Sequence, residues 1–203
     1  SQGSILGPLL FLVYINDITD DISCDIKLFA DDTSILEIVH DPHVSANRIN
    51  SDLVKIGAWG RLWKITFNAL KSISLLFSSK RQKQDHPTLN LDGTPIPESN
   101  THTHLGITLS SNLKWDAHIT RIINKASKRL ALLRRLKYKL SRKALVRLYT
   151  TMVRPILEYG CVIFDNCTDG LAKSLESVQY EAARICTRSE ERRVGKECRS
   201  RWS

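Results

Sequence analysis

The strongest constraint on the fold is a change of hydrophobic pattern near residue 111. Before it, short apolar runs alternate with turn signals, of which Asp92-Gly93 is typical of a β-hairpin. After it, three segments carry apolar residues at helical spacing: 115–140, 141–160 and 171–186. We therefore predict an α+β part over residues 1–111 and an all-helical part over residues 112–187.

Within the first part, the pattern predicts two helices and several short strands. The run after Pro8 is apolar on nearly every side, which is typical of a buried helix. Apolar residues recur at helical spacing from Val44 to Trp59, which predicts an amphipathic helix. The segments predicted as strands are residues 71–80, residues 105–109 and two hairpins, around Asp31-Asp32 and around Asp92-Gly93.

Charge and cysteine spacing narrow the function classes. The formal net charge is +9, which favours polyanionic partners without specifying one. Five cysteines form no CxxC pair and no histidine pair completes a zinc pattern, so a zinc module is not predicted. The longest apolar stretch, Ile5 to Ile15, is too short to span a bilayer, and we expect no membrane partner.

Basic residues are concentrated in the helical part. Between Trp115 and Arg147, eleven Lys and Arg residues accompany a single acid, Asp116. Such a run is often only the solvated face of a helix. Because apolar residues also recur there at helical spacing, a packed side and a basic side are predicted, and the basic side suits the phosphates of a nucleic acid.

Two adjacent aspartates, Asp31 and Asp32, interrupt the apolar stretch KLFADDTSILEIV. One interpretation is a hairpin turn, since carboxylates are common in two-residue loops. The other is a metal site, because clustered carboxylates are the ligands that hard divalent cations require. Taken alone, the pair favours the turn and leaves the metal site open.

The last residues, 188–203, differ in character from the rest of the chain. They have no apolar periodicity, and as a basic tail they could form a nucleic-acid arm. The string is, however, similar residue for residue to the translation of a common short-read sequencing adaptor. We therefore exclude it from fold reasoning and expect it to be disordered. It supplies +3 of the net charge.

Several short motifs occur in a definite order: SQGSILGPLLF, YIND, LFADDT, FNALKS and HLGI, followed by the basic helical region. Together they resemble the reverse transcriptases of non-LTR retrotransposons, and the jockey-like group most closely. The resemblance covers residues 1–187. It implies the C-terminal part of a polymerase palm, with β-hairpins and packed helices, followed by a helical thumb. The implied activity is RNA-directed DNA polymerisation on an RNA template and a DNA primer, using deoxynucleoside triphosphates and two Mg²⁺ ions.

The resemblance also implies roles for individual residues. Asp31 and Asp32 match the paired catalytic aspartates that bind the metal ions, and the first of the pair is the firmer ligand in the family. Lys71 matches the lysine that faces the triphosphate, where it could donate a proton to pyrophosphate; a solvated lysine at a strand end is the alternative.

Three further sets follow from the same resemblance. The loop expected beside the incoming nucleotide and template comprises Gln2, Gly3 and Ser4. The segment expected to grip the primer comprises His104, Leu105 and Gly106. The residues expected to contact the nucleic-acid backbone are Lys125, Lys128, Arg129, Arg134, Arg135 and Lys137.

The third catalytic carboxylate of the family lies upstream of the QGS motif. No aspartate of this chain stands in a matching context, and the only methionine is Met152, so we expect a fragment that is inactive alone. The alternative is a non-catalytic nucleic-acid-binding remnant of a decayed element. An intracellular, and specifically nuclear, location is expected from the family, whereas the sequence does not specify an oligomeric state.

Overall fold

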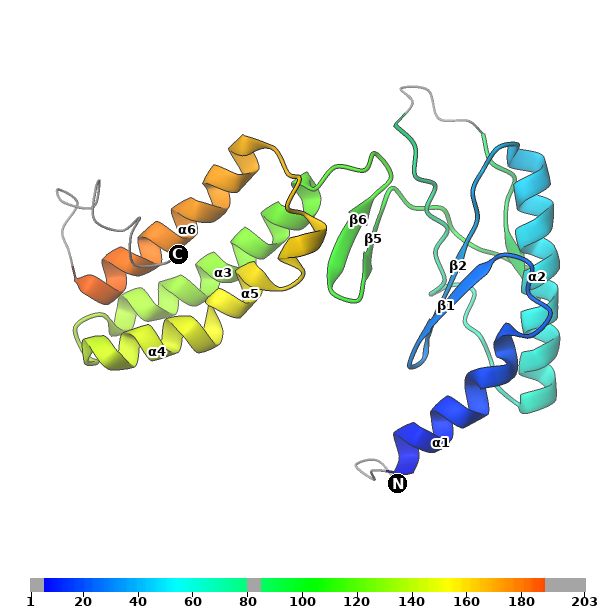
Figure 1. Ribbon diagram of the computed structural model, residues 1–203, viewed down its shortest axis with the longest axis horizontal. Helices are drawn as coiled ribbons and strands as arrows, with labels where there is room; N and C mark the ends of the chain where they lie inside the picture. Colours follow the sequence, from blue (N-terminus) through cyan, green and yellow to red (C-terminus); the bar gives the residue numbers. More distant parts are fainter. Residues whose placement is uncertain (1–5, 80–84, 189–203) are drawn as a thin grey trace. The chain divides into compact units, whose positions relative to one another are not determined.

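The computed structural model describes residues 6–79 and 85–188. The chain divides into two compact units, residues 1–100 and residues 101–203, and each is described here by itself (Figure 1). The predicted nucleotide-binding loop Gln2-Gly3-Ser4 lies outside the described residues, as does the predicted tail from residue 189 onward.

The first unit is built around one long helix. Its elements are α1 (Leu6–Ile15), the 3₁₀ helix η1 (Asn16–Thr19), β1 (Asp25–Phe29), β2 (Asp32–Leu36), α2 (Pro42–Trp63), β3 (Asn90–Leu91) and β4 (Thr94–Pro95). The carboxylate of Asp41 caps α2 by accepting the backbone N–H groups of His43 and Val44. Lys64 ends the helix in the left-handed conformation. The predicted amphipathic helix is confirmed.

Helix α2 joins two small hydrophobic clusters. Ile56 packs with Ile15 and Ile18, and the β1–β2 hairpin adds apolar side chains to this cluster. On another part of the helix, Ala46 and Leu53 form a second cluster, to which residues near β3 contribute. Figure 1 shows the β1–β2 hairpin lying beside α2. The helix is therefore the platform on which the hairpin rests.

The prediction that the first helix is buried was wrong. Helix α1 forms, but most of its side chains are exposed; the exposed fractions are 66% for Leu10 and 76% for Val13. Only its C-terminal end is anchored, through Ile15 and the partly buried Phe11. An all-round apolar pattern indicates that a helix needs cover on every side, but it does not place that cover within the same unit.

Two of the predicted strands also need correction. The segment predicted as a strand at 71–80 forms none over its described part, residues 71–79, where a single bridge pairs Ser74 with Glu98. In the segment 105–109, the strand begins only at Ile107, because the two residues before it form a turn. The hairpin predicted at Asp92-Gly93 is confirmed: both residues have positive φ, at 47° and 77°, as a type I′ turn requires.

The second unit combines a hairpin with a helical bundle. Its elements are β5 (Thr101–His104), β6 (Ile107–Ser110), α3 (Asp116–Leu136), α4 (Arg142–Met152), α5 (Arg154–Glu158), the 3₁₀ helix η2 (Cys161–Ile163) and α6 (Asp169–Thr187). The second predicted helix is divided into α4 and α5 where Pro155 cannot continue the hydrogen-bond ladder. Ser141 caps α4 by accepting the N–H of Ala144.

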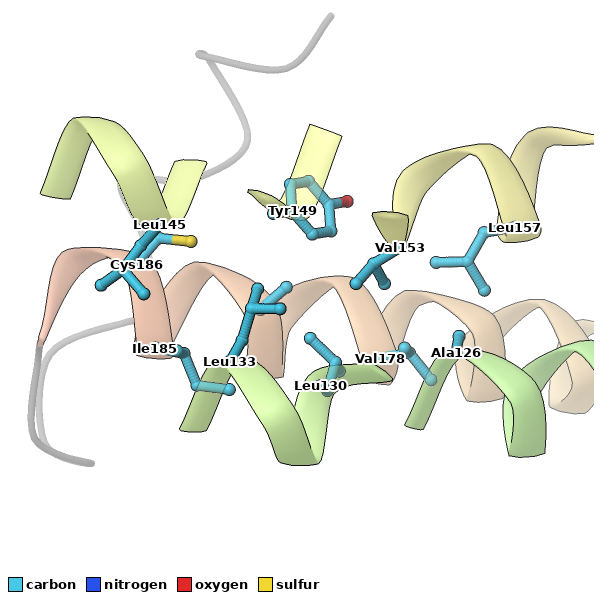
Figure 2. Packing of buried hydrophobic residues seen from close by; sticks show 11 residues of the cluster. Ala126, Leu130, Leu133, Leu145, Tyr149, Val153, Leu157, Val178, Ile185 and Cys186 are labelled. Carbon is cyan, nitrogen blue, oxygen red and sulfur yellow. The ribbon is translucent and has the colours of Figure 1, made fainter. Parts of the chain in front are cut away.

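The core of the second unit lies between α3, α4, α5 and α6. Figure 2 shows Leu130 and Leu133 of α3 facing residues of the other helices across this core. Leu145 and Leu133 have no measurable exposure, so the centre of the bundle is closely packed.

Both units together give a mixture of helices and small antiparallel sheets, consistent with the α+β prediction. In the described part of the chain, no helix is long and apolar enough to cross a bilayer.

Candidate functional site

The paired aspartates lie at the end of the β1–β2 hairpin. Phe29 pairs with Asp32, so the connecting loop consists of Ala30 and Asp31. Ala30 has a φ of 51°, whereas Asp31 does not have a positive φ. Positive φ favours glycine, and an alanine there is strained by about 1 kcal/mol or more. Backbone strain of this kind is concentrated at functional sites.

The two faces of the hairpin differ. The partly buried face presents Ile26, Leu28 and Ile35 to the cluster formed with α1, η1 and α2. The opposite face carries Phe29 and Asp32, which are both exposed. Asp31 is exposed as well. Of the surface of Phe29, 62% is exposed. One face fixes the hairpin, and its end presents the carboxylates of Asp31 and Asp32 to solvent.

A buried carboxylate on α2 holds the chain where it enters β1. Asp52 has no measurable exposure and accepts backbone N–H groups of Ser23 at 3.0 Å and Cys24 at 2.8 Å. The Ser23 hydroxyl and the Lys55 ammonium also donate to it. Burial alone would raise the pKa of Asp52, but the donors of Cys24, Ser23 and Lys55 outweigh burial and hold it well below its usual range. Burial, together with Asp52, raises the pKa of Cys24 to about 12.

Arg48 ties together the two open ends of the same hairpin. Its guanidinium donates to the carbonyl of Ser23, before β1, at 2.7 Å. It also forms an ion pair at 3.0 Å with Glu37, which follows β2. Asp52 and Arg48 were missed in the sequence, although Asp52 carries a signal. It lies between Ile49 and Ile56 on the apolar stripe of α2, where a charged residue requires partners.

The other motifs of the first unit have structural roles or are exposed. Asp17 of YIND accepts the indole N–H of Trp59 at 2.9 Å, which joins η1 to α2. Lys71 is exposed in the turn that follows α2, and its backbone N–H is held by the side chain of Asn68 at 3.2 Å. No group of three or more His, Cys, Asp or Glu residues that could hold a metal occurs among the described residues.

The HLGI motif forms the tight turn between β5 and β6. Leu105 and Gly106 are the loop residues, with φ of 45° and 80°, which corresponds to a type I′ turn. The Tyr159 hydroxyl donates to the carbonyl of Leu105 at 2.8 Å, and Arg121 donates to that of Gly106. A Cβ atom on Gly106 would lie 3.1 Å from the ring of Tyr159. Side chains of two helices therefore fix this turn.

The backbone-contacting residues predicted on α3 fall into distinct environments. Arg134 is paired with Glu181 of α6, and Lys137 lies over the ring of Tyr138. The remaining four are exposed: Lys125, Lys128, Arg129 and Arg135. Of these, Lys125 and Arg129 line a groove together with Arg121, a residue missed in the sequence.

A buried histidine joins α3 to β6. His118 is 1% exposed, and its Nδ1 accepts the backbone N–H of Thr108 at 3.1 Å. That contact requires the proton to be on Nε2, which has no hydrogen-bond partner among residues 6–79 and 85–188. The imidazole lies beside the ring of Phe164, 5.0 Å between centroids. Burial, assisted by the charge of Arg121, lowers the pKa of His118.

Comparison with known proteins gives a consistent set of relatives. The chain is 31% identical over 196 residues to the probable RNA-directed DNA polymerase from transposon X-element of Drosophila melanogaster. It is 26% identical over 200 residues to the probable RNA-directed DNA polymerase from transposon BS of the same species, and 28% identical over 194 residues to the RNA-directed DNA polymerase from mobile element jockey. These alignments cover 90–92% of this chain. No family model and no solved structure matches it.

Over nearly its whole length the chain is therefore similar to a segment of RNA-directed DNA polymerases of transposable elements, the class that its motifs resemble. The resemblance to the jockey-like group is supported by the match to the polymerase from mobile element jockey. The chain spans about one fifth of the length of the curated relatives it matches.

Proposed function

We propose that this chain supplies two functional parts of an RNA-directed DNA polymerase: a metal-binding hairpin of the palm, in the first unit, and a helical thumb that holds the template and primer, in the second. The single observation that carries the proposal is the β1–β2 hairpin. It presents the adjacent Asp31 and Asp32 to solvent at a strained two-residue loop, while its other face is packed.

The donor chemistry of the hairpin suits Mg²⁺. This ion is commonly held in proteins by one or two carboxylates together with water and substrate phosphates. Asp31 and Asp32 provide such carboxylates and are exposed, so phosphate oxygens can reach the same ion. When bound, the metal supplies positive charge beside the reacting phosphate. The chain's own contribution is to fix the carboxylates through the contacts of Asp52 and Arg48.

The metal site can be tested with Mn²⁺, which broadens NMR signals of nearby residues. We expect selective broadening at the hairpin loop that is lost in Asp31→Asn/Asp32→Asn. The matched control is Asp20→Asn/Asp21→Asn, an adjacent exposed acidic pair outside the hairpin that carries the same change of charge. Equal broadening in both double variants, or none at the hairpin in the parent chain, would contradict the metal site.

Polymerisation by the chain alone is a separate test. With two catalytic carboxylates and the third proposed to lie upstream, we expect no extension of a DNA primer on an RNA template in Mg²⁺. Extension above the level of Asp31→Asn/Asp32→Asn would show that the site is complete without a further carboxylate.

The second candidate function is non-catalytic binding of nucleic acid, which the basic face of α3 favours. It predicts that an RNA–DNA template–primer binds, with an affinity that falls steeply with salt and shows little sequence preference. Fluorescence anisotropy measures both properties. Salt-sensitive binding, together with no selective broadening at the hairpin loop in the Mn²⁺ experiment, would support non-catalytic binding over the polymerase function.

A further inference from the structure

A basic groove in the second unit is the strongest feature that the proposed function does not yet explain. It has a volume of about 570 Å³ and lies beside the β5–β6 turn at Gly106. One wall is formed by three cationic side chains of α3, Arg121, Lys125 and Arg129. The other wall includes the apolar side chains of Met152, Pro155 and Tyr159. Among the described residues, none of those that line it is acidic.

The spacing of the cations follows from the helix. Arg121, Lys125 and Arg129 are four residues apart, so they rise along α3 in steps of about 6 Å, at 1.5 Å per residue, on one side of the helix. All three side chains are exposed. Arg121 uses one donor for the carbonyl of Gly106, and a guanidinium has five, so others are free to bind an anion. The three side chains therefore form a row of positive charge along the groove.

The opposite wall suits the uncharged parts of a nucleotide. Tyr159 is 58% exposed, while its hydroxyl is anchored to the carbonyl of Leu105. An exposed aromatic ring held in one orientation is a platform on which a base can stack. Pro155 and Met152 continue the apolar surface. A cationic wall facing an aromatic one is the combination that single-stranded nucleic acids bind.

We infer that this groove binds one strand of nucleic acid, with its phosphates on Arg121, Lys125 and Arg129 and a base against Tyr159. The inference rests on the proposed function and deepens it by naming the residues and the strand state. A base that stacks on Tyr159 has to be unpaired, which a single strand offers and an intact duplex does not.

Two double variants form a matched pair for the test. Lys125→Ala/Arg129→Ala removes two charges from the groove. Lys173→Ala/Arg184→Ala removes two charges from exposed positions of α6 that do not line the groove and lie outside the basic run of α3. The assay is fluorescence anisotropy of the full chain with a single-stranded oligonucleotide and, separately, a blunt duplex, over a range of salt concentrations.

For the single strand, we expect the groove variant to lower the slope of log affinity against log salt by about 1.4, since each phosphate contact contributes about 0.7. The control variant should leave the slope nearly unchanged. For the blunt duplex, the two variants should behave alike. Tyr159→Phe should retain binding of the single strand and Tyr159→Ala should weaken it, with circular dichroism confirming that both variants are folded.

The possible failures are distinguishable. If no oligonucleotide binds the parent chain, the proposed function itself is wrong. If both charge variants weaken single-strand binding equally, nucleic acid binds without the groove, and only this inference is overturned. If the groove variant, but not the control variant, also weakens binding of the duplex, the assignment of the groove to one strand is refuted. Displacement of the oligonucleotide by polyglutamate at equal charge concentration would instead assign the groove to an acidic polypeptide.

Discussion

Replacing Asp52 by alanine tests whether α2 stabilises the β1–β2 hairpin, which is proposed to bind metal. The substitution removes the acceptor of the Cys24 N–H, which is buried and cannot turn to water. A buried donor left unpaired costs about 1–3 kcal/mol, and a lost hydrogen bond to a charged group about 1.5–3 kcal/mol. The Ser23 donors and Lys55 are more exposed and add less. We expect the free energy of unfolding to fall by about 2–4 kcal/mol, a large part of the 5–15 kcal/mol typical of a domain.

The assay is urea unfolding at pH 7, followed by the fluorescence of Trp59 and Trp63, which lie on α2. Asp25→Ala is the matched control: its pair with Lys27 is exposed, so about 0–1 kcal/mol is expected. A loss below 1 kcal/mol in Asp52→Ala, or one equal to that of the control, would refute the reasoning.

Acid provides a second measurement on the same variant. The pKa of Asp52 is depressed in the folded chain, so its contribution to stability is present above the ordinary pKa of an aspartate and is lost as the pH falls further. The difference in unfolding free energy between the parent chain and Asp52→Ala should therefore shrink below about pH 4. A difference that stays constant down to pH 2 would show that the carboxylate acts through shape and not through charge.

Three further outcomes follow from the structure. Burial lowers the pKa of His118, so its contribution to stability is present above pH 6.5 and falls as the pH drops below that value. The variant His118→Asn keeps an acceptor in place of Nδ1. It should remove this pH dependence of the unfolding free energy, measured from pH 7.5 to pH 5. Gly93→Ala should lower the free energy of unfolding in urea by about 1–2 kcal/mol, because alanine is strained in a left-handed backbone. Gly106→Ala should lower it by more, because the added Cβ also meets an aromatic ring. Leu10→Asn should change stability by less than about 0.5 kcal/mol, whereas Ile15→Ala should cost about 2–4 kcal/mol by calorimetry.

Much of the fold follows from local signals in the sequence. Helix ends at Asp41 and Ser141 and the turn at Asp92-Gly93 depend on side chains that act on their own backbone, so they are readable from short stretches. The segment 71–80 shows the limit of this approach. Its strand propensity is real, but a strand also needs a continuous ladder with a neighbouring strand, and among residues 71–79 the structure has a β-bridge at Ser74 alone.

The candidate site was only partly readable for the same reason. Asp31 and Asp32 stood out because an apolar stretch is interrupted, and a hairpin loop follows from that pattern. The residues that hold the two hairpins in place are distant in sequence. At the base of the β1–β2 hairpin, Asp52 contacts Cys24, 28 residues earlier, and at the turn between β5 and β6, Tyr159 contacts Leu105, 54 residues earlier. Such contacts are set by tertiary packing, which no local pattern encodes.

The two turns that carry the candidate function share one design, and this bears on how the chain works. In both, a two-residue loop that contains a positive φ stands at the end of a short hairpin, and side chains of helices or of a helix end hold the hairpin: Arg48 and Asp52 at the base of the first, Arg121 and Tyr159 at the tip of the second. A two-stranded hairpin alone is marginally stable in water. Rigidity therefore comes from these contacts, and substitutions at Arg48 and Asp52 should loosen the first hairpin without altering the carboxylates that are proposed to hold metal.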